Sequence, residues 1–284
     1  MQTIPELLNA GTGTLSEHDS KQVLAAYGIP VTGEKIAHTE SDAVTAATAI
    51  GYPVVLKASG AALIHKTEMN LIALDLRGEQ EVRVAYRRLT SSSEVEVNEV
   101  LVQQMVRGER EFAVGMTRDP QFGPCVMLGL GGIFTEVLGD IAFRIAPLGR
   151  RDAMNMMEEI RGSRLLDAVR GKPPIDRDVL ADILVAVGQL AMDHDVISEV
   201  DINPLKFLDG KPVAVDALIA MDPTPPGDDR PTVPHAPFGE DFPPRSIGVV
   251  GVSRVGGAPP PATARSPVVS GSVARNCAPA CPTS

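Results

Sequence analysis

The sequence predicts a mixed α/β domain over residues 15–221. Segments with helical periodicity alternate with short apolar segments of strand character, which is typical of helices packed on a sheet. Apolar residues make up 44% of the 284 residues, which is enough for a sizeable core. We therefore expect a globular domain, preceded by a short tail at residues 1–14.

The first elements of this domain have recognisable ends. Ser16 with Asp19 resembles a capping box that begins a helix, and Gly28 ends that helix. A second helix is expected over residues 41–50. A turn then leads to a short apolar strand that ends at Lys57.

The later elements follow from the same two periodicities. Strand character recurs in four segments, at residues 70–76, 99–106, 111–117 and 141–148. Helical periodicity recurs in three segments, at residues 79–89, 151–170 and 176–195. Residues 198–219 close the domain as a β-hairpin.

Oxygen-bearing side chains occupy every second position in the first strand of this hairpin. Because side chains alternate between the two faces of a strand, Glu199, Asp201 and Asn203 share one face. A two-residue turn at the Asp-Gly pair 209–210 pairs residues whose numbers sum to 419, which places Asn203 opposite Asp216. Such carboxylate and amide oxygens suit Mg²⁺, which keeps waters and substrate phosphates as further ligands. The alternative is an amphipathic edge hairpin that shows polar side chains to water.

Four other charged side chains point to phosphate chemistry. Lys57 ends an apolar strand, where a cation can meet a phosphate, and His65 is a nucleophile that titrates near neutrality. Glu111 follows a strand and a glycine, where a carboxylate can accept from ribose hydroxyls. Arg144 is the only charge in an apolar strand, so it should meet an anion or a buried carboxylate. The first three, taken singly, also fit ordinary surface residues.

Composition excludes several classes of function. The net charge of -10 and the lack of a dense basic cluster argue against a nucleic-acid groove. The longest apolar run is interrupted by Asp182 and is shorter than the roughly 20 residues that cross a bilayer. The N-terminus lacks the basic and apolar regions of a secretory signal, and 3 cysteines do not form a disulfide framework. We expect a soluble, cytoplasmic protein.

The chain changes character after the domain. Residues 222–245 are rich in proline and aspartate and read as a linker. The stretch "SIGVVGVSR" at 246–254 resembles the strand and glycine turn that open a Rossmann-type unit. Prolines exclude the helix that should follow, so the remainder, to residue 284, is expected to be a disordered tail.

Several motifs, taken in order, resemble one family. The stretches "VVLKAS", "IHKTE", "RDPQFGP", "GLGGI", "FRIAPL" and "EVDINPL" are similar to the ATP-grasp nucleotide-binding part of ADP-forming acyl-CoA (acetyl-CoA) synthetases, over about residues 15–221. The resemblance implies an ATP-grasp fold and kinship with the succinyl-CoA synthetase β subunit. It also implies ATP or ADP, Mg²⁺, and a reversible reaction through an acyl phosphate and a phosphohistidine. The main phosphohistidine belongs to a CoA-binding domain or subunit.

The resemblance also implies roles for individual residues. His65 and Arg144 would serve phosphoryl transfer. Nucleotide contacts would come from Lys57, Ser59, Lys66, Gln104, Met105, Val106 and Glu111. Mg²⁺ would be held by Asn203 and Asp216, with Asp201 and Glu199 beside them.

Three departures from the family pattern affect this interpretation. Asn70 and Leu71 stand where glycines are expected, and a side chain beside a phosphate blocks close backbone approach. Gln104 replaces the usual glutamate of the adenine hinge. The CoA-binding half begins at residue 246 and does not continue, so we interpret the tail as an out-of-frame translation or a truncation of a longer synthetase.

Other functions stay open at this point. One is a non-catalytic, nucleotide-sensing regulatory domain, and another is an ATP-grasp carboxylate ligase with an amine acceptor. A dinucleotide-binding oxidoreductase is disfavoured, because the glycine fingerprint lacks its helix and its downstream acid. The sequence does not identify the acid or the oligomeric state.

Overall fold

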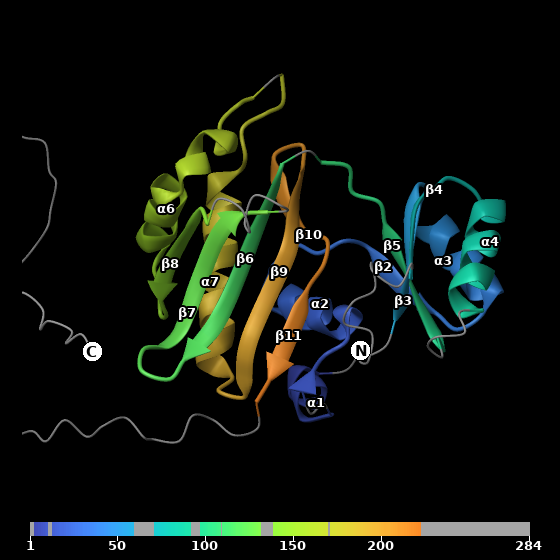
Figure 1. Cartoon of the computed structure of the whole chain (residues 1–284), viewed down its shortest axis with the longest axis horizontal. Coiled ribbons are helices and arrows are strands. Elements are labelled where there is room, and N and C mark those ends of the chain that lie inside the picture. The colour runs from blue at the N-terminus through green and yellow to red at the C-terminus, as the bar shows by residue number, and fades with distance from the viewer. Residues whose placement is uncertain are drawn as a thin grey trace, which may run out of the picture. The chain divides into compact units, whose positions relative to one another are not determined.

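The computed structural model describes residues 3–10, 13–59, 71–91, 97–108, 110–131, 139–169 and 171–222. These residues all belong to the first of the two units into which the chain divides, Met1–Thr232. They form two antiparallel sheets, each with its own helices and its own hydrophobic core (Figure 1). The predicted α/β class is confirmed.

The larger sheet is formed by strands from both ends of the described chain. Its path contains six strands, with a seventh, β10 (Lys211–Ala214), attached to β9. In spatial order these six are β1 (Gly13–Thr14), β11 (Leu218–Met221), β9 (Ile197–Leu208), β6 (Glu111–Asp119), β7 (Gly123–Leu130) and β8 (Ile141–Ile145).

Helices cover one face of this sheet. Helix α7 (Arg177–Asp193) lies along it, and α6 (Arg150–Glu159) lies beside β8 (Figure 1). Leu184 of α7 and Phe112 of β6 are fully buried in this core. The helix approaches closely at Gly188, where an added Cβ would lie 2.4 Å from Cδ2 of Leu148. Helices α1 (Ile4–Ala10) and α2 (Glu17–Ala26) contribute to the same core.

The smaller sheet has four strands with two helices packed on it. The strand order is β2 (Glu34–Ala37), β5 (Glu99–Gln104), β3 (Val54–Ser59) and β4 (Ile72–Leu76). The helices are α3 (Glu40–Ile50) and α4 (Glu79–Thr90). Their apolar faces bury Ala47, Val82 and Leu89 against the sheet.

The predicted helix starts and stops are mostly confirmed. Ser16 caps α2, because its hydroxyl accepts from the backbone N–H of Asp19 at 3.1 Å. The single helix predicted over 151–170 is wrong: α6 ends at Glu159, and a 3₁₀ turn (Arg161–Leu166) follows. The reason is Asp140, whose carboxylate accepts from the backbone N–H groups of Arg161 and Gly162 at 2.6 and 2.7 Å, which ends the helix at that point.

The predicted tail at residues 1–14 is part of the fold where it is described, because α1 packs in the larger core and β1 pairs with β11. The predictions about the segments after the domain lie outside what the structure describes. The Pro-rich linker from residue 223 onward, the Rossmann-type start and the tail are outside the described residues. Among the residues that are described, no helix is long and apolar enough to cross a membrane.

Candidate functional site

The hairpin register predicted from the sequence is confirmed. Leu208 pairs with Lys211 and Leu205 with Ala214, and the turn residues Asp209 and Gly210 adopt positive φ values of 51° and 82°. The same register continues in β11, where Leu218 pairs with Asp201. The returning strand is not continuous, however, because residues 215–217 leave strand conformation between β10 and β11.

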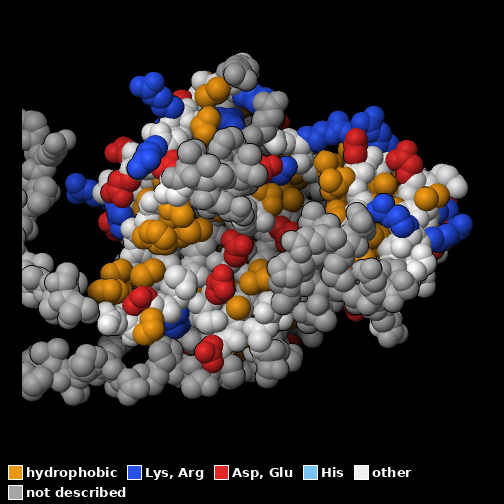
Figure 2. Space-filling model, in the orientation of Figure 1, with side chains coloured by type: hydrophobic (Ala, Val, Ile, Leu, Met, Phe, Trp, Pro, Cys, Tyr) orange, Lys and Arg blue, Asp and Glu red, His pale blue; other side chains and the backbone are white. Residues whose placement is uncertain are grey.

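Asn203 and Asp216 fall between these two ladders. Strand β9 buries Val200 and Ile202 on the helix-covered side, so Glu199, Asp201 and Asn203 lie on the opposite, open face. Figure 2 shows acidic side chains on this face over β9, and hydrophobic side chains over β7 and β8. The predicted division into an apolar and an oxygen-rich face is therefore confirmed.

The acidic side chains on this face interact electrostatically. Burial, followed by the neighbouring charges of Glu199 and Asp216, raises the pKa of Asp201 to about 6. A cation would relieve this repulsion, and hard oxygen ligands fit Mg²⁺. Within the described residues, no three His, Cys, Asp or Glu side chains form a ready-made metal centre. A Mg²⁺ site here would therefore need other ligands besides the carboxylates, such as the Asn203 amide, waters and substrate phosphates.

Lys57 lies beside this acidic group. It is in β3 and only 5% exposed, and its Nζ is 3.2 Å from Oδ2 of Asp216 and 2.6 Å from Oε1 of Glu17. Burial lowers the pKa of Lys57, but the charges of Asp216 and Glu17 outweigh it and the net shift is upward. The structure therefore brings together a protonated lysine from the small sheet and an aspartate that follows β10.

A buried cluster of charges behind Lys57 was missed by the sequence analysis. Lys21 is 1% exposed, and its Nζ lies within 3.2 Å of four oxygen atoms. These belong to Glu17 (3.0 Å), Thr32 (3.2 Å), Glu34 (2.8 Å) and Gln103 (3.2 Å). Gln103 is fully buried, and its side-chain amide also donates to the backbone oxygen of Val215 at 3.0 Å. Val215 directly precedes Asp216 in the chain.

The cluster ends at a half-buried histidine. Nδ1 of His18 lies 2.8 Å from Oε1 of Glu34. The hydrogen bond to Glu34 raises the pKa of His18, whereas burial lowers it, and the net shift is upward. The charge of Asp19 raises this pKa further, and the charge of Lys21 lowers it. A signal for the cluster was present in the sequence of α2. Positions 17, 20, 21 and 24 have the i, i+3, i+4, i+7 spacing of a core-facing stripe, and two of them are charged.

The predicted adenine-hinge residues lie at the end of β5. The backbone N–H of Gln104 donates to Gly33 at 2.9 Å and that of Met105 to Pro53 at 3.2 Å. The strand ends at Gln104, so the predicted extension of the strand to residue 106 is wrong. Val106 is buried, and it lies in the segment that leads to β6.

The other predicted residues have diverse surroundings. Ser59 is buried at the end of β3, and Glu111 begins β6 and pairs with Lys206 at 2.8 Å. Arg144 meets a carboxylate, as expected, but that of Glu159 is half exposed rather than buried. His65, Lys66 and most of the glycine-rich stretch lie outside the described residues.

Leu71 does not have the effect expected from the sequence. Its side chain is 2% exposed and packs in the core of the small sheet, and its backbone oxygen accepts from Ala58 at 2.9 Å. A side chain that points into a core does not obstruct a phosphate. This expected obstacle to nucleotide binding is therefore absent at Leu71, while Asn70 is outside the described residues.

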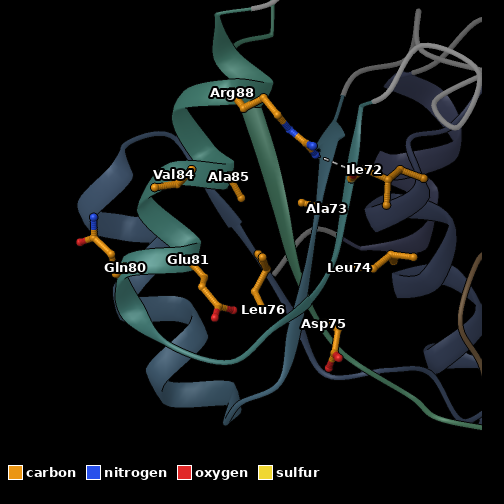
Figure 3. Close-up of a pocket in the computed structure, with 10 residues that line it drawn as sticks. All are labelled: Ile72, Ala73, Leu74, Asp75, Leu76, Gln80, Glu81, Val84, Ala85 and Arg88. Atoms are coloured by element: carbon orange, nitrogen blue, oxygen red, sulfur yellow. Dashed lines mark hydrogen bonds between the residues drawn. The ribbon is translucent and has the colours of Figure 1, made fainter.

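A cavity of about 590 Å³ lies elsewhere, between β4 and α4 (Figure 3). Its lining is mostly apolar, and Arg88 crosses it to donate to the backbone oxygen of Ile72 at 2.8 Å. None of the predicted site residues lines it. This cavity is therefore separate from the candidate site, which consists of the acidic side chains on the open face of β9, together with Asp216 and Lys57.

Comparison with known proteins identifies the family of this chain. A family model described as an ATP-grasp domain matches residues 6–221. The chain belongs to the ATP-grasp family. It is 40% identical over 223 residues to the beta subunit of acetate–CoA ligase (ADP-forming) I of Pyrococcus furiosus, covering 77% of this chain and 96% of that subunit.

Two further relatives place this ATP-grasp chain in a larger context. It is 40% identical over 225 residues to acetate–CoA ligase (ADP-forming) I of Archaeoglobus fulgidus, covering 78% of this chain and 33% of that protein. It also resembles a solved structure of acetyl-coenzyme A synthetase 1 of Ca. Korarchaeum cryptofilum, with 37% identity, a TM-score of 0.67, and coverage of 77% of this chain and 97% of that one. That structure holds coenzyme A and Mg-AMPPCP, and its phosphohistidine segment points towards the nucleotide binding site.

Proposed function

We propose that this chain is the nucleotide-binding part of an ADP-forming acid–CoA ligase. It would transfer a phosphoryl group reversibly between ATP or ADP and a phosphohistidine on a CoA-binding partner. The observation that carries the proposal is the junction of Lys57 and Asp216 beside Glu199 and Asp201. A buried ammonium that could bind phosphate and carboxylates that could bind a divalent metal thus lie at one junction. The chain also matches 96% of the length of a beta subunit.

Each side chain in this proposal has a physical task. Asn203 and Asp216, with Asp201 and Glu199 nearby, would hold Mg²⁺. When bound, Mg²⁺ supplies positive charge that stabilises the transferring phosphoryl group. Lys57 adds a buried ammonium that can contact the nucleotide phosphates.

The rest of the nucleotide would contact the small sheet and its exit. We assign the adenine to Gln104, Met105 and Val106 at the end of β5, and the ribose to Glu111. Ser59 and Lys66 would add contacts to the phosphates. His65 and Arg144 would assist the transfer. These roles rest on position in the chain and on family resemblance.

The partner follows from the division of labour in the relatives. A beta subunit and a fused ligase of three times the matched length both resemble this chain. We infer that this chain acts with a CoA-binding subunit or domain that carries the main phosphohistidine. The cytoplasmic location stays a prediction.

Calorimetry with ADP and Mg²⁺ tests the nucleotide site directly. The full chain should bind Mg·ADP, and labelled ATP should transfer acid-labile phosphate to a separately supplied CoA-binding subunit. Binding without any transfer would favour the second candidate, a nucleotide-sensing domain, for which the departure at Asn70 is the supporting feature. Failure to bind Mg·ADP would refute both.

A further inference from the structure

Six ionisable side chains form a continuous series in which negative and positive partners alternate. The series runs from the segment between β10 and β11 to β3, then to α2, to β2 and back to α2. Each member lies within 3.2 Å of the next, in the order Asp216, Lys57, Glu17, Lys21, Glu34 and His18. The proposed nucleotide function uses only its first two members.

Lys21 is the central cation of this series. Its ammonium has three protons and four oxygen neighbours, and it is almost wholly buried. One of the four is Oε1 of Glu17, the same oxygen that accepts from Lys57. Glu17 therefore divides its negative charge between two ammonium groups.

This sharing determines how much positive charge Lys57 can offer to a phosphate. Lys57 faces two carboxylates, Glu17 and Asp216. If Glu17 belonged to Lys57 alone, the local charge would be negative and would repel a polyanion. Lys21, whose charge is divided between Glu17 and Glu34, neutralises Glu17 in part, so more of the charge of Lys57 stays available than without Lys21.

We propose that Lys21 is a positioning residue for nucleotide binding, which holds and partly neutralises Glu17 and so leaves more of the positive charge of Lys57 available to the phosphates. The inference rests on the proposed function and deepens it. Lys21 acts through two other side chains and touches no ligand itself. Its influence is therefore on the phosphates and not on the adenosine part of the nucleotide.

A purely structural role for Lys21 is the competing explanation. The series joins the two sheets, and Gln103 links Lys21 to the backbone beside Asp216. A change in the fold would weaken every nucleoside ligand together. A more negative net charge around Lys57 would weaken only those ligands that carry phosphates, and this difference separates the two explanations.

The test compares ADP with adenosine in the full chain by calorimetry. In Lys21→Met, Glu17 keeps Lys57 and Glu34 keeps His18 as partners, so neither carboxylate is left unpaired. ADP should bind at least about tenfold more weakly, and adenosine within about twofold of wild type. The double variant Glu17→Gln/Lys21→Met removes both charges and should restore ADP affinity to within about threefold.

Glu17→Gln alone decides the matter if Lys21→Met does not fold. It removes a negative charge beside Lys57, so ADP should bind as tightly as to wild type or more tightly. A tenfold loss, or equal losses for ADP and adenosine in Lys21→Met, would overturn the inference. If wild type binds ADP and Lys21→Met binds it equally well, the inference alone fails. If wild type binds no ADP, the proposed function fails with it.

Discussion

Asp216→Asn should change nucleotide affinity in opposite directions with and without Mg²⁺. Asp216 has two partners in the proposed site: Lys57, which it contacts at 3.2 Å, and the divalent cation that it would bind. The substitution preserves the shape of the side chain and removes its charge. It therefore removes a strong Mg²⁺ ligand and at the same time releases Lys57 from one of its two carboxylates.

The size of the second effect follows from the exposure of the pair. The Lys57 side chain is 6% exposed and that of Asp216 is 41% exposed, so solvent screens the pair in part. Exposed ion pairs contribute about 0.2–1 kcal/mol to stability, and breaking a buried pair costs about 3–5 kcal/mol. Because Asp216 is partly exposed, we place the Lys57–Asp216 pair at the upper end of the range for exposed pairs, at about 1 kcal/mol. Metal-free ADP should therefore bind about fivefold more tightly. Mg·ADP should bind at least about tenfold more weakly, because a carboxylate ligand is lost.

Calorimetry of ADP in chelator and in excess Mg²⁺ measures both effects on one preparation. Asp75→Asn is a matched control, because Asp75 is also a partly exposed, ion-paired aspartate, at 38%, and its partners are Arg77 and Arg107 in the small-sheet half of the chain. The control should leave both affinities unchanged. Equal losses for Asp216→Asn in the two conditions would refute the assignment of Asp216 to the metal, and unchanged affinities would remove it from the site.

Two further predictions concern His18, at one end of the charge series, and Arg144 in β8. His18 has a raised pKa in the folded chain, so its pair with Glu34 stabilises the fold below about pH 6.5, and this stabilisation is lost as the pH rises through the folded pKa. Urea unfolding should therefore show His18→Asn less stable than wild type by about 0.5–1 kcal/mol at about pH 5.5, with the difference gone at about pH 9; a constant difference would contradict the pairing. Arg144→Gln breaks a half-exposed pair with Glu159 and should cost less than about 1 kcal/mol of stability. Loss of phosphoryl transfer with stability retained would support its assigned role, and full transfer would contradict it.

The hairpin was predictable because its rules are local. An Asp-Gly pair sets the turn, and the two-residue alternation of a strand then places Asp201 and Asn203 on one face without reference to the rest of the fold. The break at 215–217 accompanies a contact that these local rules do not include: the buried amide of Gln103 donates to the backbone oxygen of Val215.

The buried charges illustrate the opposite case. Lys21 and Glu17, four residues apart on a helix, have the spacing of an ordinary solvated pair. Only the structure shows that their side of α2 faces the small sheet, where Glu34 and Gln103 accept from Lys21. The prediction about Leu71 was wrong for a related reason, because the orientation of its side chain depends on the core of the small sheet and not on its neighbours in sequence.

The two sheets have separate cores, and the proposed site lies where they join. Lys57 comes from the small sheet, whereas Asp201 lies in a strand of the large one and Asp216 lies in the segment between two strands of that sheet. Between the sheets run polar links, including the backbone bond from Thr32 to Ala214 at 3.2 Å. Loss of a core side chain therefore lowers the free energy of unfolding while the site keeps its partners. Loss of a charge at the junction alters the field at Lys57 directly. Nucleotide affinity should thus respond to the junction before it responds to either core. We expect the buried series, and not the apolar packing, to determine how strongly this junction attracts a phosphate.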